Sequence, residues 1–220
     1  HSCIRCLKKL GVKIIKLEPG KYKIYGKGLG SLRAKKNTTL NCGNSGTTAR
    51  LIVGLLSTNP DIQVQITGDQ SLKKRNMSKV MSLMSDFGAS FYPKNKIKFP
   101  LTLISSEIPI GINYKSGISA QLKSAVILAG LNANGVTNIL EQKKSRDHTE
   151  NMLLNNSNVL KVIKNNKKEK YIKVFGKNYL KPLKINIGGD PSSAAFFTAL
   201  TILNSNSKLT INKVGLNPRR

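Results

Sequence analysis

One pattern occurs three times along the chain: small polar residues and glycines stand directly before a run of helix length that is apolar on every side. The runs begin near Thr47, Ala120 and Ser192, and the serines that mark them recur at a spacing of roughly 74 residues. A helix that is apolar all round has to be buried on all sides. The chain is therefore predicted to fold as repeated units with these helices inside and other elements around them.

Each apolar run leads into the same succession of elements. A strand and then a polar loop that ends in arginine follow each helix, with strands at 61–67, 135–141 and 207–213 and arginines at Arg75, Arg146 and Arg219. After the first two loops come amphipathic helices at 80–87 and 149–154, and then hairpin-like segments at 91–99 and 159–176. These are α/β units, and a closed arrangement of a few of them is expected because the period exceeds that of solenoid repeats.

The beginning of the chain fits the same succession at a later phase. Residues 3–26 are predicted to form a short amphipathic helix followed by a hairpin, the pair that comes late in the other units. The first residue is His1 rather than Met, and the last repeat stops just after its arginine loop. The sequence is therefore expected to be a piece of a longer protein.

The starts of the buried helices are predicted to bind anions. The first N–H groups of a helix lack intrahelical partners, and glycine lets another molecule approach the backbone closely. The residues that can cap these groups are Asn44, Ser45, Ser119, Asp190 and Ser192. Capping alone is the simpler explanation, but the recurrence of caps together with arginines (Arg50, Arg75, Arg146) favours sites for phosphate or carboxylate.

Charge limits the classes of partner. The chain carries 37 Lys and Arg against 10 Asp and Glu, a net charge of +27. Nucleic-acid binding is one interpretation, but a solvated, lysine-rich surface is favoured because the lysines are scattered and no predicted helix has a one-sided basic stripe. Part of the charge can also serve a small polyanionic substrate.

Neither a metal centre nor a membrane segment is expected. Cys3 and Cys6 have the spacing of half a zinc site, but only Cys42, His1 and His148 remain as further Cys or His ligands. One turn of an amphipathic helix is the preferred explanation of that spacing. No apolar run approaches the ~20 residues that cross a bilayer, and the N-terminus lacks the apolar core of a signal peptide. A cytoplasmic protein is expected.

Five motifs carry a family resemblance. In chain order they are NSGTTAR at 44–50, GDQSLKKR at 68–75, SAQLKSA at 119–125, SRDHTE at 145–150 and GDPSSAA at 189–195. Together they resemble the EPSP synthase (3-phosphoshikimate 1-carboxyvinyltransferase) family over essentially all 220 residues. The SRDHTE form is similar to the bacterial branch often called class II.

The resemblance implies a fold and a domain division. The fold is an inside-out α/β (α+β) barrel built of βαβαββ units, with helices buried and sheets outside. Residues 1–187 are then most of the first-half domain, which binds shikimate 3-phosphate and here lacks its N-terminal unit. Residues 188–220 begin the return into the second domain.

The resemblance also implies a reaction for the whole protein. The family transfers the enolpyruvyl group of phosphoenolpyruvate to the 5-hydroxyl of shikimate 3-phosphate, on the route to chorismate and the aromatic amino acids. The reaction proceeds by addition and then elimination of phosphate, without metal, cofactor or covalent intermediate. The 220-residue piece alone is expected to be inactive. The whole protein is expected to be a monomer that binds these two small molecules and neither nucleic acid nor membrane.

Residue roles follow from the same resemblance. Arg75 and Gln121 are the expected catalytic contacts, with Arg75 gripping phosphoenolpyruvate and Gln121 touching both substrates. The set for phosphoenolpyruvate is Asn44, Gly46, Thr47, Arg50, Arg75 and Gln121. The set for shikimate 3-phosphate is Ser119, Ala120, Gln121, Ser145 and Arg146. Caps or surface charges are the alternative explanation for each. This alternative has more weight for Asp147, His148 and Asp190, because capping and loop-fixing roles suit them.

Two departures and two rival functions stay open. Asn76 stands where the family usually has proline, and Arg219, before Arg220, stands where it commonly has threonine. One rival is the sister enolpyruvyltransferase that acts on UDP-N-acetylglucosamine, which requires a catalytic cysteine loop; Cys42 lies just before the cap and not in such a loop. The other rival is a basic nucleic-acid-binding module.

Overall fold

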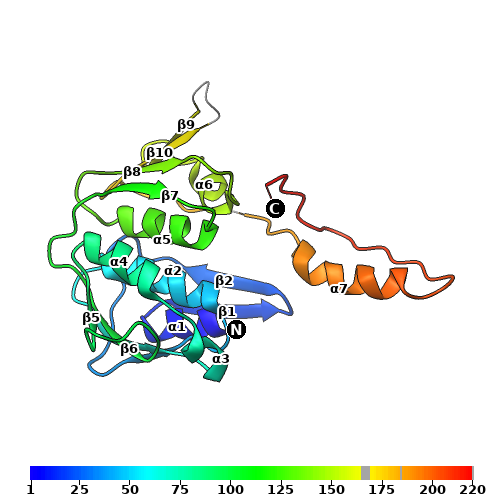
Figure 1. Ribbon diagram of the computed structural model, residues 1–220, viewed down its shortest axis with the longest axis horizontal. Helices are drawn as coiled ribbons and strands as arrows, with labels where there is room; N and C mark the ends of the chain where they lie inside the picture. The colour runs from blue at the N-terminus through cyan, green and yellow to red at the C-terminus, as the bar shows by residue number, and fades with distance from the viewer. Residues whose placement is uncertain (165–168, 184, 220) are drawn as a thin grey trace. The chain divides into compact units, whose positions relative to one another are not determined.

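The computed structural model describes residues 1–164, 169–183 and 185–219 (Figure 1). The predicted hairpin turn at 165–168 and Arg220 lie outside these residues. The chain divides into two compact units, His1–Lys181 and Pro182–Arg220. All ten strands of the described chain, β1 to β10, belong to the first unit.

The first complete repeat covers residues 39–104. Its elements are β3 (Thr39–Asn41), α2 (Gly46–Ser57), β4 (Gln63–Thr67), α3 (Gln70–Lys74), α4 (Ser78–Asp86), β5 (Ser90–Tyr92) and β6 (Leu101–Ile104). The strands form one sheet in the order β3-β4-β6-β5, in which β3 and β4 are parallel and the other neighbours antiparallel. Strands β5 and β6 pair antiparallel, but the bounds predicted for this hairpin, 91–99, are wrong, because the second strand lies at Leu101–Ile104. Pro100, directly before it, lacks the N–H that a ladder needs.

The second repeat has the same order of elements, without a counterpart of α3. They are β7 (Asn113–Ser116), α5 (Ala120–Gly130), β8 (Val136–Glu141), α6 (His148–Leu153), β9 (Leu160–Lys164) and β10 (Lys170–Phe175). The sheet order is β7-β8-β10-β9, again with the first pair parallel. Both repeats are thus βαβαββ units, as predicted. The short strands β3 and β7 and the short helix α3 are additions to the elements predicted from residue patterns.

The N-terminal segment is a helix followed by a hairpin. Helix α1 (Ser2–Lys9) buries Cys6 and contacts β3. Strands β1 (Lys13–Glu18) and β2 (Lys21–Tyr25) pair antiparallel in a separate two-stranded sheet. The succession predicted for residues 3–26 is confirmed.

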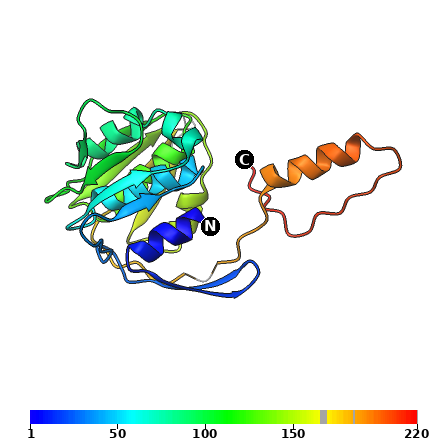
Figure 2. The same cartoon turned by 90° about the horizontal axis from the view of Figure 1, so that it is seen from below.

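The apolar helices of the first unit lie between its sheets (Figure 1, Figure 2). Helix α5 packs against β7, β8 and β10, whereas α2 packs against β6 and against α5 itself. The two helices approach each other closely at Gly54 of α2. A Cβ added there would lie 2.7 Å from the Cα of Ala125 in α5. Exposed and buried residues alternate along β4 and β8, so each sheet turns one face to the helices and the other to solvent.

The described residues of the second unit form one helix and extended chain. Helix α7 (Pro191–Ile202) begins after Asp190, whose Oδ1 accepts a hydrogen bond from the Ser192 N–H at 3.0 Å. Its predicted burial is wrong, since Phe196 and Phe197 are 80% and 62% exposed. The predicted strand at 207–213 is also wrong, because the only β pairing within residues 185–219 is an isolated bridge between Gly189 and Val214. A strand and an apolar helix both need a neighbouring layer, which the described residues of this unit do not supply.

Candidate functional site

Serines cap the starts of α2 and α5. Ser45 Oγ accepts a hydrogen bond from the Thr48 N–H at 3.1 Å, and Ser119 Oγ accepts one from the Leu122 N–H at 3.4 Å. Each cap satisfies one of the first N–H groups of its helix, while the positive end of the helix dipole stays at the same place. The predicted caps at these two positions are confirmed.

Two arginines lie over the start of α2. Arg75, at the end of α3, donates from Nη2 to Asn44 Oδ1 at 2.7 Å. Arg50, one turn into α2, donates from Nη1 to the Gly46 carbonyl at 3.3 Å. A Cβ added at Gly46 would lie 2.7 Å from Arg75 Nη1 and 2.9 Å from Arg50 Nη1. The absence of a side chain at position 46 is therefore what leaves room for both guanidinium groups.

These guanidinium groups concentrate positive charge. The pKa of Arg50 lies below its ordinary value, first because the side chain is partly buried and second because Arg75 is positively charged. Across residues 1–164, 169–183 and 185–219, no carboxylate forms an ion pair with either arginine. Guanidinium groups without a carboxylate partner, placed at a helix N-terminus, are suited to binding phosphate or carboxylate.

Gln121 joins the starts of α2 and α5. Its Oε1 accepts a hydrogen bond from Arg50 Nη1 at 2.9 Å, and its Nε2 donates one to Thr47 Oγ1 at 2.8 Å. The structure thus connects all six residues predicted for phosphoenolpyruvate, namely Asn44, Gly46, Thr47, Arg50, Arg75 and Gln121.

The residues predicted for shikimate 3-phosphate lie at the start of α5 and in the loop after β8. Ser119 and Ala120 directly precede Gln121 and are partly exposed. Ser145 is buried and donates its hydroxyl to Glu141 Oε1 at 2.7 Å, whereas Arg146 is exposed. Ser119 and Ala120 are thus brought beside the arginines through Gln121, while Ser145 points into the protein.

Comparison with known proteins assigns the chain to a family. The family model for EPSP synthase (3-phosphoshikimate 1-carboxyvinyltransferase) matches residues 1–220. The chain belongs to the EPSP synthase family. A relative named 3-phosphoshikimate 1-carboxyvinyltransferase from Desulforamulus reducens is 42% identical over 221 residues, which cover 100% of this chain and 50% of the relative. One of the same name from Parvibaculum lavamentivorans is 38% identical over 215 residues, which cover 97% of this chain and 47% of the relative.

A solved structure gives the same result. EPSP synthase from Acinetobacter baumannii is similar with a TM-score of 0.81 and 32% identity, over 99% of this chain and 48% of that chain. The similarity confirms the predicted inside-out α/β fold of the EPSP synthase family. The chain spans about half the length of the curated relatives and the solved structure that it matches.

Behind Ser145, this EPSP synthase family chain has a buried ionic cluster to which the motifs assign no role. Lys123 Nζ lies 2.6 Å from Glu141 Oε1 and 2.6 Å from Glu150 Oε1, and the lysine is 0% exposed. Glu141 Oε1 also accepts a hydrogen bond from the Ser145 N–H at 3.2 Å. A signal for the cluster was present in the sequence, because a lysine one turn into an otherwise apolar helix has to find a buried partner.

The pKa of Glu141 reflects this cluster. Burial by itself raises the pKa, but hydrogen bonds from Lys123 and Ser145 and the charges of Lys123 and Lys170 outweigh burial. The pKa of Glu141 therefore lies below its ordinary value, and the carboxylate form is favoured in the folded chain.

This pKa predicts a pH dependence of stability. A carboxyl whose pKa is lower in the folded state stabilises the fold above its unfolded pKa of about 4.3, and this stabilisation is lost as the pH falls through the folded value. We expect the free energy of unfolding of the wild-type chain to exceed that of Glu141→Gln, and this excess to be largest near neutral pH. The excess is expected to shrink below about pH 4.3. Urea unfolding across this range measures it. A difference that stays constant down to acid pH contradicts the expectation.

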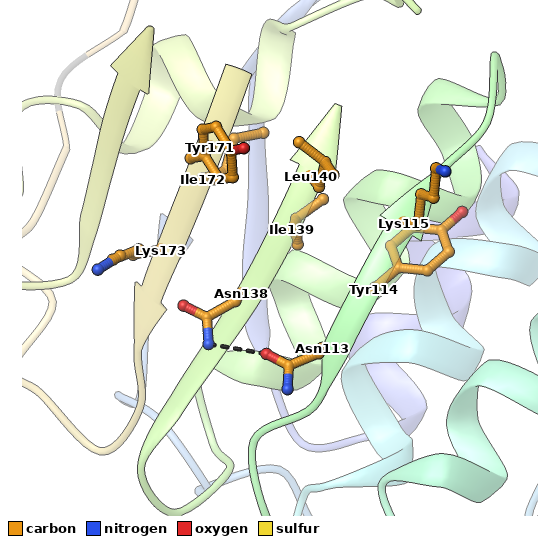
Figure 3. A pocket seen from close by; sticks show the side chains of 9 residues that line it. All are labelled: Asn113, Tyr114, Lys115, Asn138, Ile139, Leu140, Tyr171, Ile172 and Lys173. Atoms are coloured by element: carbon orange, nitrogen blue, oxygen red, sulfur yellow. Dashed lines mark hydrogen bonds between the residues drawn. The ribbon is translucent and has the colours of Figure 1, made fainter. Parts of the chain in front are cut away.

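A hollow of about 340 Å³ lies on the solvent face of the β7-β8-β10 part of the second sheet (Figure 3). Asn138 Nδ2 donates to Asn113 Oδ1 at 2.9 Å along one side of it, and Tyr171 and Lys173 line another part. None of the residues predicted for either substrate lines this hollow. The candidate site is therefore the cluster at the helix starts.

The cysteines and the helix lengths are the features that bear on metal and membrane sites. Cys3, Cys6 and Cys42 are free, and Cys6 is the buried residue of α1. In the described ranges, no three side chains of His, Cys, Asp or Glu gather as a metal ion requires. The helices within those ranges also lack the length and apolar character of a membrane span.

Proposed function

We propose that the full-length protein containing this chain transfers the enolpyruvyl group of phosphoenolpyruvate to the 5-hydroxyl of shikimate 3-phosphate, with release of phosphate. The contact of Gln121 with both Arg50 and Thr47 carries the proposal, because it joins two helix starts beside a pair of arginines. Two substrates that each carry a phosphate and a carboxylate need such a place. The names of the relatives, 3-phosphoshikimate 1-carboxyvinyltransferase, support the same reaction.

In this proposal the arginines hold phosphoenolpyruvate. Arg75, which Asn44 orients, and Arg50, which is partly buried, offer N–H groups to its phosphate and carboxylate. Gly46 and Thr47 form the wall at the start of α2. Fixed guanidinium groups also stabilise the negative charge that moves to the phosphate during elimination. Gln121, between the helix starts, contacts both substrates.

Shikimate 3-phosphate is assigned to the start of α5 and the loop after β8. The first-turn N–H groups near Ser119 and Ala120 and the exposed guanidinium of Arg146 receive its phosphate. Ser145 has to turn its hydroxyl from Glu141 to the substrate, while its N–H stays on Glu141 Oε1. We assign 1–187 to the first-half domain and 188–220 to the return into the second. A monomeric, cytoplasmic full-length protein completes the proposal, with proton transfer supplied by the other half.

The rival enolpyruvyltransferase is disfavoured by cysteine burial. A catalytic cysteine has to meet substrate, but Cys42 is 0% exposed and Cys6 is 1% exposed. Cys3, which is exposed, lies on α1 rather than in a loop beside the arginines.

One set of measurements tests the proposal. The full-length protein is expected to release phosphate from phosphoenolpyruvate with shikimate 3-phosphate but not with UDP-N-acetylglucosamine. The 220-residue chain alone is expected to show at most weak binding of shikimate 3-phosphate, by thermal shift, and no turnover. Retention on a polyanion column that collapses with modest salt, without any response to shikimate 3-phosphate, indicates nucleic-acid binding instead. Turnover by the chain alone near the full-length rate contradicts the assigned division of the site.

Gly46→Ala is expected to raise the KM for phosphoenolpyruvate about tenfold, because the new Cβ displaces the ends of Arg75 and Arg50. Stability changes little, since both ends belong to flexible side chains. Initial rates of phosphate release give the KM. Gly117→Ala is the matched control in the other cap loop, where a Cβ meets nothing within 4 Å. An unchanged KM in Gly46→Ala counts against the assignment of the two arginines.

A further inference from the structure

Lys123 ties three elements together beneath the loop at 142–147. The lysine belongs to α5, and its carboxylate partners are Glu141, the last residue of β8, and Glu150, in the first turn of α6. The two glutamates flank the loop on either side. One buried ammonium therefore holds both ends of this loop against the helix whose start is assigned to substrate.

The first repeat shows that this packing does not require charges. When the caps Ser45 and Ser119 are aligned, Lys123 corresponds to Ala49, and the last residue of β8, Glu141, corresponds to Thr67 at the end of β4. Ala49 is fully buried in the same type of helix. Buried ion pairs carry a desolvation cost, and apolar residues of similar volume stabilise a core as well or better. The fold alone thus gives no reason for the cluster.

The loop gives such a reason. Glu141 Oε1, which Lys123 holds, accepts both the N–H of Ser145 at 3.2 Å and its hydroxyl at 2.7 Å. Two residues further, Asp147 Oδ2 lies 3.5 Å from Lys170 Nζ of β10. Both neighbours of Arg146 are therefore fixed by buried charges, while Arg146 itself is exposed. The backbone on each side of the arginine is held, and its guanidinium is directed outward.

We propose that Lys123 is a positioning residue for shikimate 3-phosphate: through Glu141 and Ser145 it fixes the loop that presents Arg146 to the substrate phosphate. The inference rests on the proposed function and adds to it a residue that does not touch substrate. It agrees with the lowered pKa of Glu141, which keeps this acceptor ionised. Arg75 and Arg50 lie on other elements, and Gln121 of α5 is held by Arg50 and Thr47 of α2 rather than by the loop. The binding of phosphoenolpyruvate is therefore expected to depend much less on the cluster.

The test replaces the whole cluster in the full-length protein. Lys123→Met alone leaves two buried carboxylates without a counter-ion, so the main variant is Lys123→Met/Glu141→Met/Glu150→Met, which leaves no buried charge among the three. The matched control is Ser124→Ala/Thr149→Val. It removes the hydrogen bond of 2.7 Å between Ser124 Oγ and Thr149 Oγ1, which links the same two helices one residue away and does not reach the loop.

Steady-state kinetics give the readout. The triple variant is expected to raise the KM for shikimate 3-phosphate about tenfold or more, because the loop is misplaced, with the KM for phosphoenolpyruvate unchanged and kcat altered less than about threefold. The control is expected to leave both KM values unchanged. Circular dichroism confirms folding of both proteins.

Several outcomes overturn the inference. A folded triple variant with an unchanged KM for shikimate 3-phosphate excludes positioning by the cluster. An equal rise of both KM values, or misfolding of the triple variant while the control folds, assigns the cluster to stability. If the wild-type protein does not turn over the two substrates, the proposed function fails and this inference with it. If the wild-type protein turns over the two substrates but the triple variant changes both KM values equally or neither of them, only the inference fails.

Discussion

Replacing Arg75 with methionine in the full-length protein is expected to lower kcat/KM for phosphoenolpyruvate by about 10²–10³. Two charge-assisted hydrogen bonds to a phosphate or carboxylate contribute about 3–4 kcal/mol together, and methionine fills similar space without a donor. The melting temperature is expected to stay the same, because Arg75 is exposed and its hydrogen bonds go to Asn44 and Ser71, which are exposed as well.

Lys74→Met is the matched control for this prediction. Lys74 is the exposed last residue of α3, directly before Arg75, so the control removes the same unit of charge one position away. If Arg75 acts only by attracting anions through its charge, both variants lose kcat/KM to a similar extent. If Arg75 binds the substrate directly, only Arg75→Met loses kcat/KM. Initial rates of phosphate release at fixed ionic strength compare the two. Similar losses in both variants show that Arg75 acts only through its charge.

The elements around the site were predictable because their signals are local. A serine before an all-round apolar run predicts a capped, buried helix, and both Ser45 and Ser119 are such caps. The contact of Arg50 with Gln121 is different, because it joins the starts of two separate helices. No periodicity indicates it. Only the resemblance of the ordered motifs to a family placed these two residues at one site.

The features that could not be predicted depend on contacts between residues far apart in the sequence. The cluster of Lys123 depends on which ends of a loop meet α5, and residue spacing carries no information about that. The strand predicted at 207–213 has β-type residues, but a strand forms only where a neighbour completes the ladder. The same holds for α7, whose apolar residues are predicted to be buried and are exposed in a unit whose described residues form no second layer.

Gly54→Ala is expected to lower the free energy of unfolding of the chain by about 2 kcal/mol or more. The new Cβ would lie 2.5 Å from the carbonyl oxygen of Ala125 and 2.7 Å from its Cα. These are backbone atoms of α5 and cannot rotate away. The guanidinium groups near Gly46 can, because they end flexible side chains. Alanine favours a helix over glycine by ~1 kcal/mol, but the forced separation of α2 and α5 outweighs this gain.

The same separation reaches the site, since Gln121 of α5 bonds to Arg50 and Thr47 of α2. We therefore expect kcat/KM of the full-length Gly54→Ala protein to fall along with its stability. Urea unfolding followed by circular dichroism measures the first effect, and phosphate release the second. Gly26→Ala is the control, because a Cβ there meets nothing within 4 Å. If Gly54→Ala and Gly26→Ala have equal free energies of unfolding, α2 and α5 tolerate a wider spacing. Close packing of the two helices then does not explain the glycine at position 54.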